Sequence, residues 1–196
     1  MRWCHRVRPV VANPERRAEI TDAALEVLGA NGSRGLTHRA VDRAAGVPLG
    51  TTANYFPSRA GLLLAMARRI FNRLAPEPDR VAELASLPPE RATVEYAAYA
   101  AERLLADSTL ALALVELRLE AARQPDVRHA LEPFLRQGYS DDASFHVDQG
   151  LPGGRPAVLV THHLVMGVVL DALTVPLDPS RSPVDEIRQS VATLFT

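Results

Sequence analysis

The chain has 196 residues, of which 47% are hydrophobic and 23% are charged, which is typical of a folded soluble protein and unlike a disordered one. The net charge is −1, yet the first 75 residues hold twelve arginines and only five acidic residues, so this part is basic and the remainder acidic. This asymmetry has two interpretations. One is chance clustering, and the other is a basic N-terminal part (the head) that binds a polyanion, joined to an acidic remainder (the body) with another function. The single cysteine, Cys4, excludes an internal disulfide framework and fits a reducing compartment.

The N-terminal segment contains arginines but no apolar run long enough for a signal peptide. The most apolar run comes much later, at residues 157–170, and is interrupted by His162 and His163. Spanning a bilayer takes about 20 apolar residues, so this run predicts a buried helix. We therefore expect a cytoplasmic protein with no membrane partner.

The first helix is predicted to begin at Asn13, because Asn is a good N-cap and the following Pro14 fits the first helical position. Apolar residues at helical spacing follow, and the glycines between 29 and 32 are expected to end the helix. Thr37 can cap a second, short helix whose buried side holds Val41, Ala44 and Ala45. Gly46 suits the left-handed residue at its end.

A third and a fourth helix are predicted next. Pro48 cannot continue the second helix but can open the third, from about Leu49 to Tyr55. Ser58 can cap the fourth, which carries an apolar stripe and reaches to about residue 75.

The remainder of the chain also predicts helices, and nothing in it is typical of a sheet. A proline-rich break at residues 76–89 comes first. The predicted helices then cover residues 90–106, 108–123, 126–147 (polar, either continuous or broken), 157–174 and 184–195. The fold class predicted is all-α.

A short helix, a glycine turn and a second short helix are the layout of a helix-turn-helix. The third helix presents small residues at its N-terminal end, and Thr51 and Thr52 can donate or accept hydrogen bonds at base edges. Nearby Arg39, Arg43 and Arg59 can meet phosphates. The pattern favours DNA binding over simple bundle connectivity.

Residues 16–64 resemble the N-terminal domain of the tetracycline-repressor (TetR) family in features that occur in the same order. The shared features are the paired alanines at 23 and 24, the glycine closing the first helix, the threonine opening the second, the Ala-Gly-Val turn at 45–47, the Gly-Thr before Tyr55-Phe56, and Pro57-Ser58 with a basic residue at 59. Two positions depart from the family pattern: Ala53 stands where a tyrosine is frequent, and Pro48 replaces a common serine.

The resemblance implies a homodimeric regulator, usually a repressor, that releases its double-stranded DNA operator when a small-molecule effector binds. It implies an N-terminal three-helix DNA-binding domain with a basic arm (1–57, arm 1–12), a connecting helix (58–75), and a helical ligand-binding and dimerisation domain (76–196). Arg2, Arg6 and Arg8 of the arm would add phosphate or minor-groove contacts. The expected DNA-binding residues are Thr37, Arg39, Arg43, Pro48, Leu49, Gly50, Thr51, Thr52, Asn54, Tyr55 and Arg59. Phe56 is expected in the core.

The body resembles the family less, and its site residues are expectations from apolar pattern and family architecture. The candidates for an effector pocket are Tyr96, Tyr99, Leu112, Glu116, Phe134, His163 and Met166, each of which also fits a plain core. The candidates for a two-fold four-helix interface are Val158, Val165, Val168, Val169, Val191 and Leu194. A monomer core that wraps the 157–174 helix fully is the alternative to the dimer.

Enzymatic functions find little support in the sequence. The adjacent His162 and His163 project about 100° apart on a helix, unlike zinc ligands four residues apart. Cys4 in a terminal segment is a poor nucleophile candidate. We therefore expect no enzymatic activity, no metal and no cofactor. The alternative function is a helical small-molecule binder that acts through protein contacts without binding DNA.

Overall fold

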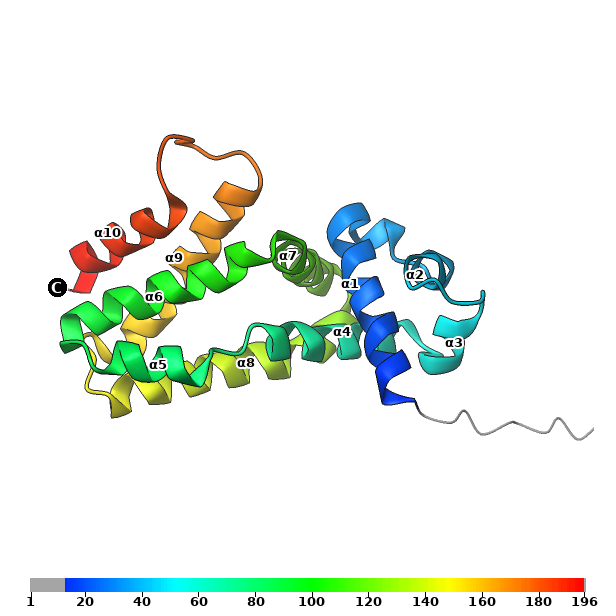
Figure 1. Cartoon of the computed structure of the whole chain (residues 1–196), viewed down its shortest axis with the longest axis horizontal. Helices are drawn as coiled ribbons and strands as arrows, with labels where there is room; N and C mark the ends of the chain where they lie inside the picture. The colour runs from blue at the N-terminus through cyan, green and yellow to red at the C-terminus, as the bar shows by residue number, and fades with distance from the viewer. Residues whose placement is uncertain (1–12, 196) are drawn as a thin grey trace, which may run out of the picture.

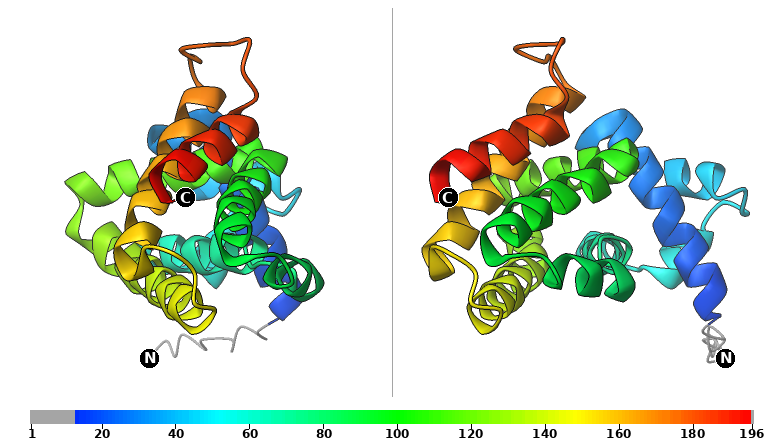
Figure 2. Two further views of the ribbon diagram at one scale, coloured as in Figure 1. Left: turned by 90° about the vertical axis from the view of Figure 1, so that its left-hand side faces the viewer. Right: turned by 60° about the vertical axis from the view of Figure 1, so that its left-hand side comes forward.

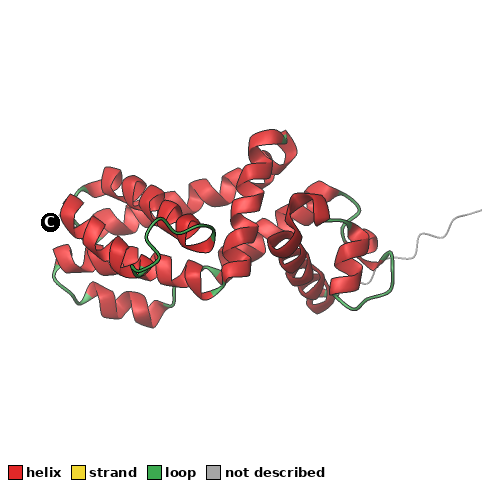
Figure 3. Cartoon of the chain, turned by 90° about the horizontal axis from the view of Figure 1, so that it is seen from above, coloured by secondary structure: helices red, strands yellow, loops and turns green. Residues whose placement is uncertain are grey.

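The computed structural model describes residues 13–195, and this range forms ten helices and no strand (Figures 1 and 3). The helices are α1 (Pro14–Gly35), α2 (His38–Ala44), α3 (Thr51–Tyr55), α4 (Arg59–Arg73), α5 (Pro78–Ala85), α6 (Pro89–Ala106), α7 (Ser108–Arg123), α8 (Pro125–Asp148), α9 (Gly154–Leu173) and α10 (Pro183–Phe195). Helices α1–α3 lie at one end of the molecule and α5, α6, α9 and α10 at the other (Figure 1). The predicted all-α fold is confirmed.

The start of α1 is the one predicted. The Asn13 side chain accepts a hydrogen bond from the backbone N–H of Arg16 at 3.1 Å, and Pro14 opens the helix. The helix loses regular geometry at Gly32, where φ is 65° and ψ is −177°, and one further turn follows up to Gly35. The glycine therefore kinks α1 at the place where its end was predicted.

The α2–α3 turn depends on two glycines with positive φ. Gly46 has φ 62° after α2, as the sequence predicts. Gly50 has φ 91° and occupies the N-cap position of α3, so α3 begins at Thr51 instead of Leu49. Of the three residues predicted on the buried side of α2, Val41 is buried and Ala45 half-buried, whereas Ala44 is exposed.

Two prolines are accommodated in helices of the body. α5 occupies the segment predicted to be a proline-rich break, because Pro78 sits in its first turn, where a missing N–H costs nothing. α8 runs without interruption through Pro133, although proline removes an interior hydrogen bond. Its packing against α4, α7 and α9 along its length stabilises the continuous form.

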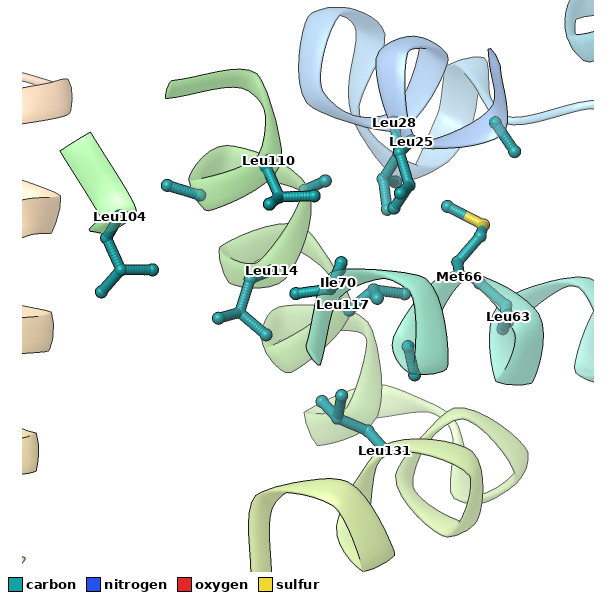
Figure 4. Close-up of a cluster of buried hydrophobic side chains, with 14 of the residues drawn as sticks. Leu25, Leu28, Leu63, Met66, Ile70, Leu104, Leu110, Leu114, Leu117 and Leu131 are labelled. Carbon is teal, nitrogen blue, oxygen red and sulfur yellow. The ribbon is translucent and has the colours of Figure 1, made fainter. Parts of the chain in front are cut away.

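A single apolar core joins the two ends of the molecule. α1 packs against α7, and α4 packs against α8 and α7. Figure 4 shows the side chains where these helices meet, with leucines of α1 and α7 and residues of α4 facing one another. The labelled residues are Leu25, Leu28, Leu63, Met66, Ile70, Leu104, Leu110, Leu114, Leu117 and Leu131, all at most 9% exposed.

α9 differs from the other helices because it is apolar on nearly every side. By length and composition it is the one helix in the described range that could cross a membrane, and 22% of its most apolar window is buried. It packs against α8, α10 and α6, with α10 lying along α6 (Figure 2). Leu159, Val160 and Leu170 on α9 remain exposed. An apolar face of this size calls for a second surface to cover it.

Candidate nucleic-acid interface and internal cavity

The position of α3 is fixed by one buried carboxylate on α2. Asp42 is 0% exposed, and its two oxygens accept backbone hydrogen bonds from Gly50 and Thr52, each at 2.7 Å. Burial by itself raises the pKa of the Asp42 carboxyl, but the hydrogen bonds of Thr52 and Gly50 and the nearby His38 outweigh it, so the pKa is lowered. Because Gly50 has no side chain to cap α3, Asp42 caps it from the neighbouring helix.

Asp42 was not among the predicted site residues. The available signal was a single acidic residue in a strongly basic segment, eight residues before a glycine. A spacing of eight residues does not predict this contact from the sequence, because the contact forms only when the turn brings α3 back onto α2.

The exposed tip of the helix-turn-helix consists of small or uncharged residues. Leu49 is 70% exposed, and Pro48, Gly50 and Asn54 are also exposed. Thr51 and Tyr55 are partly exposed, and the Thr51 hydroxyl donates a hydrogen bond to the Pro48 carbonyl at 2.5 Å. These residues form a slim surface that a DNA groove can approach.

Thr52 does not belong to this surface, which corrects its assignment as a base-contacting residue. It is 0% exposed, because its side of α3 faces α2 and the Asp42 carboxylate. In a helix as short as α3, adjacent threonines project about 100° apart, so Thr51 and Thr52 cannot both face outward. Phe56, by contrast, is 1% exposed, as the predicted core position requires.

Of the four described arginines near α3, Arg39 and Arg43 have free side chains, whereas Arg17 and Arg59 are engaged by other protein groups. Arg39 and Arg43 are exposed, and their side chains make no hydrogen bond or ion pair within residues 13–195. Thr37 is also exposed, and its hydroxyl oxygen accepts from the Ala40 N–H at 3.2 Å. Arg17, not predicted, donates to the Tyr55 carbonyl at 3.1 Å and lies over the Phe56 ring at 4.2 Å.

Arg59, predicted to meet a phosphate, has a side chain that is 40% exposed, but its guanidinium is engaged by groups of the protein. It donates to the Leu36 carbonyl at 3.0 Å and to the Ser33 hydroxyl at 3.3 Å, and pairs with Glu120 at 3.6 Å. The arginines of the predicted arm, Arg2, Arg6 and Arg8, lie outside the described residues.

A polar junction connects α1 to α7 beside Arg59. The Ser33 N–H donates to Glu116 at 3.3 Å, and the Ser33 hydroxyl donates to Glu120 at 2.5 Å. Glu120 is 6% exposed and also accepts from the Gln124 amide. Glu116 therefore faces α1, which corrects its assignment to the effector pocket.

Two adjoining cavities of about 310 and 470 Å³, each partly open to solvent, lie in the body. Of the candidates for an effector pocket, Tyr96 and Tyr99 line the smaller cavity, and Phe134 and Met166 line the larger. Seven residues line both: Pro76, Ala100, Arg103, Asp141, Asp142, Thr161 and His162. The volumes are those of sites for drug-sized ligands.

Two further pocket predictions are wrong, and a neighbour replaces one of them. Leu112 lies outside the lining of both cavities, and His163 is exposed on the outer face of α9. His162 is the histidine that lines the cavities, because it lies about 100° around the helix from His163. An adjacent pair in sequence gives no indication which member faces inward.

The charged groups of the cavities differ in burial. Arg103 on α6 donates through Nη1 to the Leu74 carbonyl and lies over the Tyr99 ring at 4.9 Å, but its buried Nε has no hydrogen-bond partner within the described residues. Burial lowers the pKa of the Arg103 guanidinium, and Tyr99 and Asp142 oppose this in part. Leaving such a buried donor unpaired costs about 1–3 kcal/mol.

The acidic groups near Arg103 are more open to solvent. Asp142 pairs with His162 at 2.9 Å, with side chains 60% and 41% exposed. Asp141 is exposed and accepts from the Gln137 amide at 2.7 Å. Exposed pairs of this kind contribute about 0–1 kcal/mol. Arg103 is therefore the charged residue of the cavities that would gain most from a further hydrogen-bond acceptor.

The predicted interface residues on α9 and α10 lie mostly on the inner face. Val158, Val165, Val169 and Val191 are each at most 7% exposed within the single chain, which corrects their assignment to a contact between subunits. Val168 is half-buried and Leu194 is 55% exposed. The outer apolar residues are Leu159, Val160, Leu170, Val175, Leu177 and Leu194.

A search of residues 13–195 for groups of three or more His, Cys, Asp or Glu side chains able to hold a metal ion finds none. The lining of the smaller cavity contains two histidines, His146 and His162, and two aspartates, with Arg103 close by.

Known proteins match both ends of the chain. Residues 20–66 match the bacterial regulatory proteins of the tetR family, and residues 88–196 match the tetracyclin repressor-like C-terminal domain. The latter match alone covers more than half of the chain. The helix-turn-helix head and the helical body with a cavity define a class of two-part regulatory proteins, and this chain belongs to the TetR family.

Individual relatives are more distant. The transcriptional repressor KstR of Mycolicibacterium smegmatis is 38% identical over 80 residues, 41% of this chain and 39% of that protein. The transcriptional regulator BetI of Rhizobium meliloti is 31% identical over 124 residues, 63% and 61% of the two chains. The chain thus spans less than two thirds of the length of these curated relatives. The crystal structure of the multidrug binding protein EbrR complexed with imidazole superposes with a TM-score of 0.63 at 27% identity, covering 94% of this chain and 97% of that one.

Proposed function

We propose that the chain is a homodimeric transcriptional regulator that binds operator DNA through α2 and α3 and loses affinity when a small molecule fills the body cavity. The observation that carries this proposal is the geometry of α3. Asp42 accepts hydrogen bonds from the backbone of Gly50 and Thr52 and so holds α3 against α2, while Leu49 and Asn54 stay exposed and Arg39 and Arg43 on α2 stay exposed and, within residues 13–195, unpaired. That arrangement supplies groove contacts flanked by phosphate contacts.

The remaining parts of the proposal draw on the body and on the relatives. A repressor is favoured over an activator by the likeness to KstR, which is itself named a repressor. The cavities and the likeness to EbrR, a multidrug binding protein, support a small-molecule effector. The outer apolar face of α9 supports a dimer, which would act on the genome in the cytoplasm.

The direct test is a mobility-shift assay on DNA fragments, beginning with the DNA that flanks the protein's own coding region. We expect sequence-selective binding whose affinity falls linearly on a log–log plot against salt, with a slope of about 0.9 per phosphate neutralised. Footprints are expected on two half-sites about 34–36 Å apart or a multiple of that distance. Binding with neither sequence preference nor salt dependence would contradict the proposal and favour a binder that acts through protein contacts.

Two variants distinguish base contacts from phosphate contacts. Leu49→Ala removes an exposed side chain at the tip of the turn, so it should alter the preference at one base position by about 1–3 kcal/mol without lowering stability. Arg43→Ala should weaken binding to all sequences and reduce the salt slope by about one.

The control is Arg91→Ala, which removes an exposed arginine on α6, a helix of the body that does not contact α3. Equal effects of Arg43→Ala and Arg91→Ala would mean that the head is not the surface that binds DNA.

A further inference from the structure

Arg103 lies where the two body cavities meet, and it is the only residue among those that line both to carry a fixed positive charge. The Leu74 carbonyl engages Nη1, and the Tyr99 ring covers one face of the guanidinium. Within the described residues no protein acceptor reaches Nε, which is buried. The buried Nε is not accessible to a ligand, but Nη2 also makes no hydrogen bond within the described residues and is not buried, so Nη2 is the donor that a molecule in the cavities can reach.

The carboxylates nearby are engaged elsewhere. Asp142 is hydrogen-bonded to His162, and Asp141 to Gln137, and both aspartates are exposed. Burial lowers the pKa of Arg103, which indicates that its charge lies in a poorly solvated place. The interaction of Arg103 with an anionic acceptor is therefore more favourable than that of an exposed aspartate with a cation. Solvent screens the interaction of the exposed aspartate more strongly.

The larger cavity also has an apolar part of its lining. Phe71 and Phe134 stack with ring centroids 5.7 Å apart, and Leu104 and Met166 complete this part of the lining. A hydrocarbon chain or ring is the chemistry that such a lining binds.

We propose that the effector is an apolar carboxylic acid whose carboxylate accepts hydrogen bonds from Arg103 and whose hydrocarbon part lies against Phe71, Leu104, Phe134 and Met166. The inference rests on the proposed function, because it names the chemical class of the molecule that occupies the body cavity. A lipophilic cation held by Asp142 and the tyrosine rings is the competing occupant, and the same experiment distinguishes the two.

The test measures binding of matched probes to the full chain by isothermal titration calorimetry at pH 7.5. One set is 4-phenylbutanoate, 4-phenylbutylamine and 4-phenylbutan-1-ol, and the other is octanoate, octylamine and octan-1-ol. In at least one set the carboxylate should bind about tenfold or more tightly than both its amine and its alcohol, as expected for a charge-assisted hydrogen bond. Tighter binding of the amines, equal affinities, or no binding by either carboxylate overturns the proposal.

Two substitutions locate the preference within the cavity. Arg103→Met keeps an unbranched apolar chain but removes the donor, so it should reduce the carboxylate preference to about twofold or less. Arg91→Met makes the same change at an exposed arginine of α6 that lines neither cavity, so it is the matched control and should keep the preference. A preference that survives Arg103→Met, in a variant with the wild-type circular dichroism spectrum and melting curve, overturns the proposal. If Arg103→Met does not fold, the ranking of probes on the wild type decides alone.

A mobility-shift assay on the same protein preparations separates this inference from the proposed function. Intact, salt-dependent operator binding together with an amine preference would overturn the effector class alone. Loss of all sequence-selective DNA binding would instead overturn the proposed function, whichever probe binds.

Discussion

The Asp42 carboxylate takes the place of the side-chain cap that Gly50 cannot supply to α3. Asp42→Asn keeps the size of the side chain but replaces one acceptor oxygen by an NH₂ group, which then faces the N–H of Gly50 or Thr52. We expect the free energy of unfolding to fall by about 1.5–3 kcal/mol, as for other buried hydrogen bonds to a charged group. Urea unfolding measures this change, and operator affinity should fall with it. The control is Asp148→Asn at the exposed end of α8, for which no loss is expected.

The same carboxylate gives the stability a definite pH dependence. The pKa of Asp42 in the folded protein lies below its ordinary value, so the folded state favours the ionised form. Its contribution is therefore fully present above the unfolded value of about 4 and is lost as the pH falls through the folded pKa. The stability difference between wild type and Asp42→Asn should persist from pH 5 to 8 and shrink below pH 4. A difference that grows on acidification contradicts this assignment.

Single residues differ in how much of their environment the sequence reveals. Phe56 could be placed in the core because a large aromatic beside a helix start has few other sites. Thr52 and Arg59 could not be placed, because the inward side of α3 depends on Asp42 and the direction of Arg59 on Glu120, which is 61 positions further along the chain. Such contacts join segments that only the assembled fold brings together.

At the scale of helices, existence was predictable and orientation was not. Helix starts follow from local chemistry, as the side-chain caps of Asn13, Thr37 and Ser58 demonstrate. The buried face of α9 is different, because the helix is apolar nearly all round and its sequence marks no side for the core. The valines assigned to a contact between subunits consequently lie inside the chain, while Leu159 and Leu170 face outward.

The polar interactions of Glu120 at the junction between α1 and α7 are expected to stabilise the protein. Glu120→Gln should lower the free energy of unfolding by about 1–3 kcal/mol, because Gln cannot satisfy Ser33, Gln124 and Arg59 together. Glu132→Gln, at an exposed pair with Arg136, is the same change at the surface and should cost less than about 1 kcal/mol. Equal losses in urea unfolding would show that the junction contributes no more than a surface pair.

The whole molecule combines a head and a body that share one apolar core with a face on α9 that its own chain leaves uncovered. α1 packs on α7, and α7 lines the larger cavity through Leu114 and Arg118, so the cavity and the head are linked by contiguous helices. Occupancy of the cavity can therefore bias the orientation of α1 and, through α2, of α3. In a dimer, a small rotation of each head changes the distance between the two copies of α3, on which simultaneous groove contact depends.

The assembly itself is tested by placing charges on the outer face of α9. In a two-fold dimer each substituted residue meets the same patch of its partner, so Leu159→Glu combined with Leu170→Glu introduces four carboxylates into one apolar interface. Burying unpaired carboxylates is costly, and we expect the protein to become monomeric by sedimentation velocity at about 10 μM while its helical circular dichroism spectrum is retained. Val147→Glu, at an exposed valine of α8, is the matched control and should remain dimeric.

The monomer should also lose at least about a hundredfold in operator affinity, because two linked heads gain that much by binding together. A double variant that sediments as a dimer would place the interface elsewhere, and a wild type that sediments as a monomer would remove the basis for a two-half-site operator.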